Sequence, residues 1–173
     1  MKTRQLPDVC RRSARNAVRM AMDVNRNAPV VVELEVFTRA APGTVWNLHT
    51  DIDRWPEWNP HIERANLRGP LRVGATFDWC TAGLEITSTI GELVPQRRIA
   101  WGGRTRGIDG LHVWTFSPQP EGVLVRTEES WDGEPVRVDP TNLRTALEAS
   151  LRDWLSALKR CAETGARPAG ESV

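Results

Sequence analysis

The chain has 173 residues, of which 40% are hydrophobic and 26% charged, and its formal net charge is +1. This composition is typical of one soluble globular domain, and no apolar run reaches the roughly 18 residues that a membrane span needs. The three cysteines lie far apart, without the spacing of a zinc site or a disulfide framework. The composition therefore excludes a membrane-spanning protein and a disulfide-rich scaffold.

Positive charge is concentrated at the start of the chain. Residues 1–28 carry seven Lys/Arg against Asp8 and Asp23, a net charge of +5, so the rest has a net charge of −4. The body therefore has no basic footprint for nucleic acid. Small apolar residues recur at helical spacing between Cys10 and Ala21. We expect residues 1–28 to form a basic N-terminal extension, helical or disordered.

The beginning of the chain also bears on processing and location. The true start can be Met1, Met20 or Met22. The N-terminus has no apolar segment of the kind found in secretory signals, so a cytoplasmic location is expected.

A strand and two proline corners open the main domain. Alternation of apolar and polar residues predicts a strand over 30–38. Pro42 then suits the first position of a short helix. Trp55-Pro56 and Asn59-Pro60 allow no more than a second helical turn at about 53–58, because the residue before proline is disfavoured in the α region.

Six more strands are predicted after residue 61. Turns rich in Gly and Pro separate them, and such short connections require antiparallel neighbours. The predicted strands cover 62–67, 75–81, 84–94, 98–106, 110–117 and 123–134.

The longest predicted helix comes last. Asp139-Pro140 forms its N-cap and first position, and Gly165 ends it. Apolar residues recur along it at spacings of three and four, namely Leu143, Leu147, Leu151, Trp154, Leu158 and Cys161. This stripe has only the open face of a curved antiparallel sheet to pack against. The expected fold is α+β: about seven strands wrapped around a C-terminal helix in a domain of residues 29–165, followed by a flexible tail over 166–173.

Short motifs recur in a fixed order along this domain. They are Ala41-Pro42-x-x-Val45-Trp46-x-Leu48, Asp53-x-Trp55-x-x-Trp58-x-Pro60, Leu71-x-Val73-Gly74-x-x-Phe77, Gly91-Glu92-Leu93-Val94-Pro95 with Ile99-Ala100-Trp101, Gly122-Val123-x-Val125 and Trp154-Leu155-x-x-Leu158-Lys159. Their order resembles the START-like, or SRPBCC, superfamily, in particular its polyketide cyclase/dehydrase branch. The resemblance implies a helix-grip fold with a deep hydrophobic cavity, which relatives use for lipids, polyketides or plant hormones, or as a scaffold for catalysis.

Aromatic residues are the candidates for the cavity wall. Of the 11 aromatics 8 are Trp and none is Tyr, and Trp combines large apolar area with one N–H donor. The candidate ligand-binding residues are Trp55, Trp58, Phe77, Trp79, Ile86, Ser88, Trp101, Trp114, Phe116, Thr127 and Trp131. Each aromatic taken alone also fits simple core packing. Trp55 and Trp58 either line an entrance for the ligand or pack the lid.

His112 and Glu129 are the candidate acid/base pair. Strand alternation places both on inward faces of neighbouring predicted strands, and imidazole beside a carboxylate suits enolisation, aldol cyclisation or dehydration. The same placement also fits two groups that only satisfy each other or that face solvent.

The leading hypothesis is therefore a domain that binds a hydrophobic or aromatic small molecule, lipid or polyketide-like, in an internal cavity. A polyketide cyclase/dehydratase that uses His112 and Glu129 is the alternative, and a regulatory module with a protein partner is a third. No cofactor is expected, and no metal, since His49, Asp51 and His61 lack metal-site spacing. The GxSxG, P-loop and GxGxxG motifs are absent. We expect a monomer or a homodimer.

Overall fold

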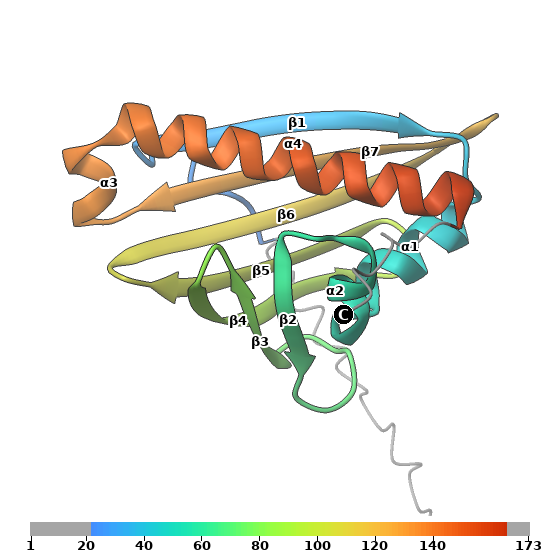
Figure 1. The fold of residues 1–173 in the computed structure, drawn as a ribbon, viewed down its shortest axis with the longest axis horizontal. Helices are drawn as coiled ribbons and strands as arrows, with labels where there is room; N and C mark the ends of the chain where they lie inside the picture. Colours follow the sequence, from blue (N-terminus) through green and yellow to red (C-terminus); the bar gives the residue numbers. More distant parts are fainter. Residues whose placement is uncertain (1–21, 166–173) are drawn as a thin grey trace, which may run out of the picture.

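The computed structural model describes residues 22–165, and its centre is one antiparallel sheet (Figure 1). Its strand order is β1-β7-β6-β5-β4-β3-β2. The strands are β1 (Val30–Thr38), β2 (Ile62–Leu67), β3 (Thr76–Thr81), β4 (Leu84–Val94), β5 (Arg98–Thr105), β6 (Ile108–Gln119) and β7 (Gly122–Asp132). The predicted fold class, a seven-stranded antiparallel sheet with a long C-terminal helix, is confirmed.

The helices lie on one face of this sheet. They are α1 (Pro42–Thr50), the 3-10 turn η1 (Ile52–Arg54), α2 (Trp55–Trp58), α3 (Glu134–Val138) and α4 (Pro140–Thr164). Figure 1 shows α4 running along β1 and β7, with α3 at its N-terminal end and α1 and α2 toward its C-terminal end. None of the described helices is both long and apolar enough to cross a membrane.

Helix α4 has defined ends and one apolar side. Asp139 Oδ1 accepts a hydrogen bond from the Asn142 amide at 3.2 Å, and Gly165 ends the helix with a φ of 64°. The predicted stripe faces the sheet, where Leu147, Leu151 and Leu158 are at most 1% exposed. Packing of this stripe holds the helix to the sheet, because a helix of this composition gains most of its stability from tertiary contacts.

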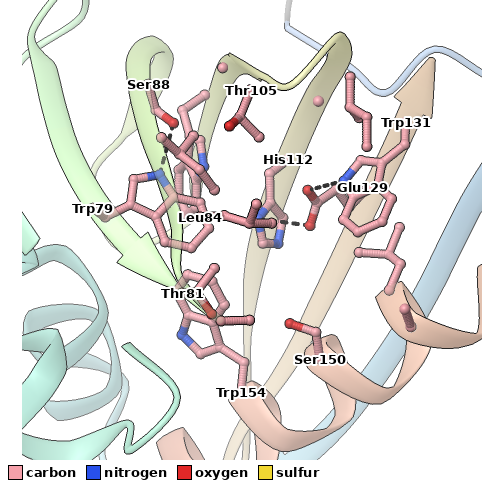
Figure 2. A pocket seen from close by; sticks show the side chains of 18 of the residues that line it. Trp79, Thr81, Leu84, Ser88, Thr105, His112, Glu129, Trp131, Ser150 and Trp154 are labelled. Carbon is pink, nitrogen blue, oxygen red and sulfur yellow. Dashed lines mark hydrogen bonds and ion pairs between the residues drawn. The ribbon is translucent and has the colours of Figure 1, made fainter. Parts of the chain in front are cut away.

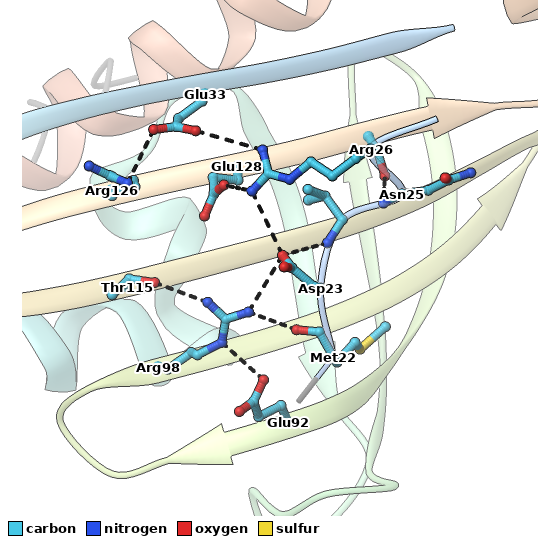
Figure 3. Close-up of polar contacts among 12 residues, drawn as sticks. Met22, Asp23, Asn25, Arg26, Glu33, Glu92, Arg98, Thr115, Arg126 and Glu128 are labelled. Carbon is cyan, nitrogen blue, oxygen red and sulfur yellow. Dashed lines mark hydrogen bonds and ion pairs between the residues drawn. The ribbon is translucent and has the colours of Figure 1, made fainter. Parts of the chain in front are cut away.

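Residues 22–28 lie on the opposite, outer face of the sheet (Figure 3). Val24 is buried against Ala100 and Val113, and Arg98 donates a hydrogen bond to the Met22 carbonyl at 2.8 Å. Part of the expected N-terminal extension is thus packed and non-helical. The helix predicted between residues 10 and 21 and the tail over 166–173 lie outside the described residues.

Several strand boundaries differ from the prediction by one or two residues, and the end of β7 has an identifiable cause. The last strand ends at Asp132 rather than at residue 134, and the short helix α3 begins immediately afterwards. Gly133 adopts a φ of 129°, and Asp132 Oδ1 accepts hydrogen bonds from the Gly133 amide and from Arg137, both at 2.7 Å. This local turn ends β7 at Asp132, although the sequence pattern predicted a strand up to residue 134.

Candidate functional site

A cavity of about 280 Å³ lies between the sheet and the N-terminal half of α4 (Figure 2). Side chains from β3 to β7 form its floor, and Leu143, Leu147 and Trp154 of α4 form its roof. Seven of the predicted site residues line it: Trp79, Ile86, Ser88, Trp101, His112, Glu129 and Trp131. The volume is near the lower end of the range for small-molecule pockets.

Two tight hairpin turns border the cavity, opposite the exposed Ala146 and Ser150 of α4. The β3–β4 turn is Ala82-Gly83, with φ values of 48° and 68°, and the β5–β6 turn is Arg106-Gly107, with φ values of 47° and 82°. Two positive φ values in succession are those of a type I′ hairpin turn, which suits the twist of the flanking strands. The cavity therefore opens between hairpin tips and helix.

His112 and Glu129 meet at the inner wall of this cavity. They are direct neighbours in the β6–β7 register, and His112 Nδ1 lies 3.2 Å from Glu129 Oε2, without the alignment of a good hydrogen bond. Trp131 Nε1 donates to Glu129 Oε1 at 2.7 Å, and His112 Nε2 lies 2.8 Å from Thr127 Oγ1. Each ring nitrogen of the imidazole therefore has an oxygen beside it.

Burial shifts the ionisation of both groups toward their neutral forms. Removal from water raises the pKa of Glu129 from 4.5 to about 7, although the hydrogen bond from Trp131 opposes the shift. Burial also lowers the pKa of His112 well below its ordinary value, and the nearby His49 adds to that effect. Near neutral pH the imidazole is therefore uncharged and the carboxyl is close to its titration midpoint, so it can both accept and donate a proton.

His49 belongs to the aromatic core rather than to a metal site. Its ring centroid lies 4.4 Å from that of Trp114 and 5.8 Å from that of Trp101, and burial lowers its pKa to about 3. Neither ring nitrogen has a hydrogen-bond partner among residues 22–165. The sequence carried a signal for this position, because His49 follows the core residue Val45 by four positions on α1.

The remaining predicted residues do not line the cavity. Phe77, Trp114 and Phe116 are at most 2% exposed and fill the core, while Thr127 is buried beside His112. Trp55 is fully buried, and its Nε1 donates to the His49 carbonyl at 2.8 Å. Trp58 borders a separate hollow of about 410 Å³ between α1, α2 and the end of α4. The structure thus places the tryptophan corner away from the cavity opening.

Several lining residues were not among the predicted site residues. The wall formed by α4 includes Ala146 and Ser150, which flank the predicted stripe, and the floor includes Gly103 and Gly110. The helical spacing of the stripe indicated which side of α4 is buried, but not which part of it faces open space.

Metal binding finds no support in the described part of the chain, where no three His, Cys, Asp or Glu side chains cluster as ligands. The three residues that were considered as metal ligands lie in different environments. His49 is buried in the core, whereas Asp51 and His61 are exposed. His61 instead lies 3.5 Å from Asp153 of α4.

The sequence profile of a family described as polyketide cyclase/dehydrase and lipid transport matches residues 29–163. The chain belongs to this family. The match covers the whole sheet and almost all of α4, which are the elements that enclose the cavity. No curated protein matches the chain in sequence.

Several solved structures share the fold of this chain. A hypothetical protein from Helicobacter pylori has a TM-score of 0.73 at 18% identity, covering 81% of this chain and 92% of its own. A START superfamily protein from Mycobacterium smegmatis has a TM-score of 0.69 at 14% identity, covering 79% and 99%. The di-domain ARO/CYC protein StfQ of steffimycin biosynthesis has a TM-score of 0.65 at 20% identity, covering 78% and 51%. At these identities the similarity establishes the fold alone.

Proposed function

We propose that this family member binds a small, flat, mostly apolar molecule with one or two polar substituents in the cavity between sheet and α4. The observation that carries the proposal is an apolar cavity with one carboxyl–imidazole pair on its wall. Among the described residues that line the cavity, Glu129 is the single carboxylate, and none is a Lys or Arg. Such a wall disfavours strongly charged ligands, because a charge is costly to bury without a partner.

The size of the cavity narrows the ligand class. At about 280 Å³ it suits a molecule of two or three fused rings better than a long acyl chain. Trp79, Trp101, Trp131 and Trp154 supply flat apolar surfaces for stacking, and Ser88 and Glu129 supply polar contacts. The family description includes both cyclase/dehydrase and lipid-transport members, and we favour the polyketide-like class for this chain.

Calorimetric titration of the purified protein with 2-naphthol and with oleate tests this proposal. We expect saturable binding of 2-naphthol and much weaker binding of oleate. Ala146→Phe should lower the affinity for 2-naphthol at least tenfold, because Ala146 lines the cavity and a phenyl ring there fills part of it. A folded wild-type protein that binds neither probe contradicts the proposal.

Ala149→Phe is the matched control for this experiment. Ala149 is an exposed alanine of the same helix but does not line the cavity. Its substitution should leave the affinity for 2-naphthol within about twofold of wild type, since exposed substitutions away from a site usually have small effects. Equal losses in the two variants would point to a general effect on α4.

Acid–base catalysis on a bound ketone is the second candidate function, and the shifted pKa of Glu129 supports it. In an enolisation, the Glu129 carboxylate removes a proton from the carbon next to the carbonyl. The C–H electron pair then forms the C=C bond of the enolate, and the π electron pair of the C=O bond moves onto the oxygen. Return of the proton to carbon completes an exchange. For a β-hydroxy ketone, transfer of the proton to the hydroxyl group instead releases water and gives the dehydrated product.

Deuterium exchange measures this chemistry directly. In D₂O, 2-tetralone should exchange the hydrogens next to its carbonyl faster with wild-type protein than in buffer alone. Glu129→Gln should abolish the acceleration while leaving naphthalene binding unchanged. If wild-type protein gives the buffer rate although the ketone binds, the cavity is a binding site without this activity.

A further inference from the structure

Two glycines interrupt the floor of the cavity next to Glu129. The strand register places Ser88, Gly103, Gly110 and Trp131 in one row across β4, β5, β6 and β7. All four residues line the cavity. The middle of this row therefore presents only backbone, between a hydroxyl at one end and an indole at the other.

On the side toward the interior of the protein, side chains project into the cavity next to Gly103 and Gly110. The adjacent row across β5, β6 and β7 is Trp101, His112 and Glu129. The His112 side chain is 3% exposed, lines the cavity, and its Nδ1 has no aligned hydrogen-bond partner among the described residues. On the outer side, Thr105 and Ile108 line the cavity at the β5–β6 turn. Gly103 and Gly110 thus form a flat backbone surface, called the shelf below, that borders the His112–Glu129 pair.

The two glycines differ in the space around them. A Cβ atom at Gly103 would lie 2.7 Å from Ser88 Oγ and 3.0 Å from the Thr87 carbonyl oxygen, so Gly103 is needed for strand packing. A Cβ atom at Gly110 would meet Glu129 Oε1 and Trp131 Cδ1 at 3.6 Å each, which are ordinary contacts. Neither residue has a positive φ. The fold therefore tolerates alanine at Gly110, and the absence of a side chain there leaves open space beside the carboxyl.

We infer that Gly110 is a specificity-determining residue: a planar fused ring lies on the Gly103–Gly110 backbone and presents an oxygen substituent to Glu129. This inference rests on the proposed function and narrows it to flat phenols and ring ketones. A methyl group at residue 110 occupies the place where that oxygen approaches Oε1. Branched or puckered rings are also disfavoured, because they cannot lie flat on a backbone surface that has side chains on both sides.

The experiment compares naphthalene with 2-naphthol, which differ by one hydroxyl group. Dissociation constants are measured from the indole ¹H–¹⁵N resonances of the full chain. We expect wild-type protein to prefer 2-naphthol by about tenfold, the usual value of one buried hydrogen bond. In Gly110→Ala this preference should fall to about twofold or less, with naphthalene still bound.

Gly43→Ala is the control for a general effect of replacing glycine by alanine. Gly43 lies in α1, outside the cavity, and a Cβ atom there would have no neighbour within 4 Å. This variant should keep the wild-type preference. In wild-type protein, 2-naphthol should also shift the Trp131 indole resonance more than naphthalene does, since Trp131 Nε1 donates a hydrogen bond to Glu129. This second measurement requires no variant to fold.

The outcomes separate the inference from the proposed function. Equal affinities of wild-type protein for the two probes, a preference that survives in Gly110→Ala, or equal shifts of the Trp131 resonance overturn the inference and leave cavity binding intact. Failure of wild-type protein to bind either probe overturns both. A preference lost in Gly110→Ala and kept in Gly43→Ala supports the shelf as the ligand site.

Discussion

Glu129 illustrates how a single buried carboxyl couples stability to the site. Its side chain is 13% exposed, at the cavity wall, and burial raises its pKa to about 7. The neutral acid accordingly costs the fold little, whereas the carboxylate must be held with one indole N–H and a neutral imidazole. A shifted pKa of this kind is found at functional sites more often than elsewhere.

Replacing Glu129 by Gln should change how stability depends on pH. Because the pKa of Glu129 is higher in the folded than in the unfolded chain, its stabilisation is fully present below about pH 4.5 and is lost as the pH rises through 7. Relative to Glu129→Gln, wild-type protein should lose about 2–3 kcal/mol between about pH 5 and pH 8. Urea unfolding of both proteins over this range measures the difference.

Buried histidines act in the opposite direction, so the comparison uses the difference between the two proteins. Burial lowers the pKa of His49 to about 3, and therefore wild-type protein and variant both lose stability as the pH falls below about 6.5. This shared loss cancels when the curves are subtracted. Parallel curves from about pH 5 to pH 8 would show that the Glu129 carboxylate is held at no cost.

At the scale of elements, α4 both anchors the fold and closes the site. Toward its C-terminal end Leu155 and Leu158 are buried in the main core with Trp46 and Trp55. Toward its N-terminal end Ala146 and Ser150 border open space. Trp154 belongs to both regions, since its ring lies 5.5 Å from Trp114 and also lines the cavity.

Truncation of the anchoring part should be costly. Leu158 is fully buried, and Leu158→Ala should lower the free energy of unfolding by about 2–5 kcal/mol through lost burial and the void that remains. Ser156→Ala on the exposed side of the same helix should change it by about 0.5 kcal/mol or less. Chemical denaturation gives both values. Similar effects of the two substitutions would argue against this packing of α4.

At the scale of the whole molecule, the segment over residues 22–28 ties both halves of the sheet together from outside. Arg26 forms an ion pair with Glu128 of β7, which is 7% exposed, while Arg98 of β5 lies between Glu92 and the Met22 carbonyl (Figure 3). Val24 covers apolar side chains between these polar contacts. Part of the outer face of the sheet is thus covered by chain that precedes its first strand.

Removal of this segment should destabilise the domain. A chain shortened to begin at residue 29 should be roughly 2–4 kcal/mol less stable than one shortened to begin at residue 22, since it loses the burial of Val24 and leaves Glu128 without Arg26. Thermal and urea unfolding measure the difference. Val24→Ala in the longer chain separates the apolar contribution from the ionic one. Equal stability of the two shortened chains would show that the contacts on the outer face contribute nothing.

Local signals in the sequence determined the order of elements. The alternation in β1 and β7, the proline corners around α1 and α2, and the capped stripe of α4 each depend on residues close together in the chain. Strand alternation also placed His112 and Glu129 on faces that meet, because neighbouring antiparallel strands share a pleat. Helix α3 escaped prediction because its start depends on the backbone conformation of Gly133 rather than on a periodic pattern.

Only the tertiary structure decided which inward-facing residues border open space. Trp101 and Trp114 follow the same alternation rule, yet Trp101 lines the cavity and Trp114 fills the core. The cavity likewise lies near the two hairpin turns and not at Trp55 and Trp58. Periodicity specifies the direction of a side chain, whereas a cavity depends on how far apart the packed elements stay. Here Gly103 and Gly110 contribute no side chains to the floor of the cavity, and Trp154 of α4 lines it from the other side.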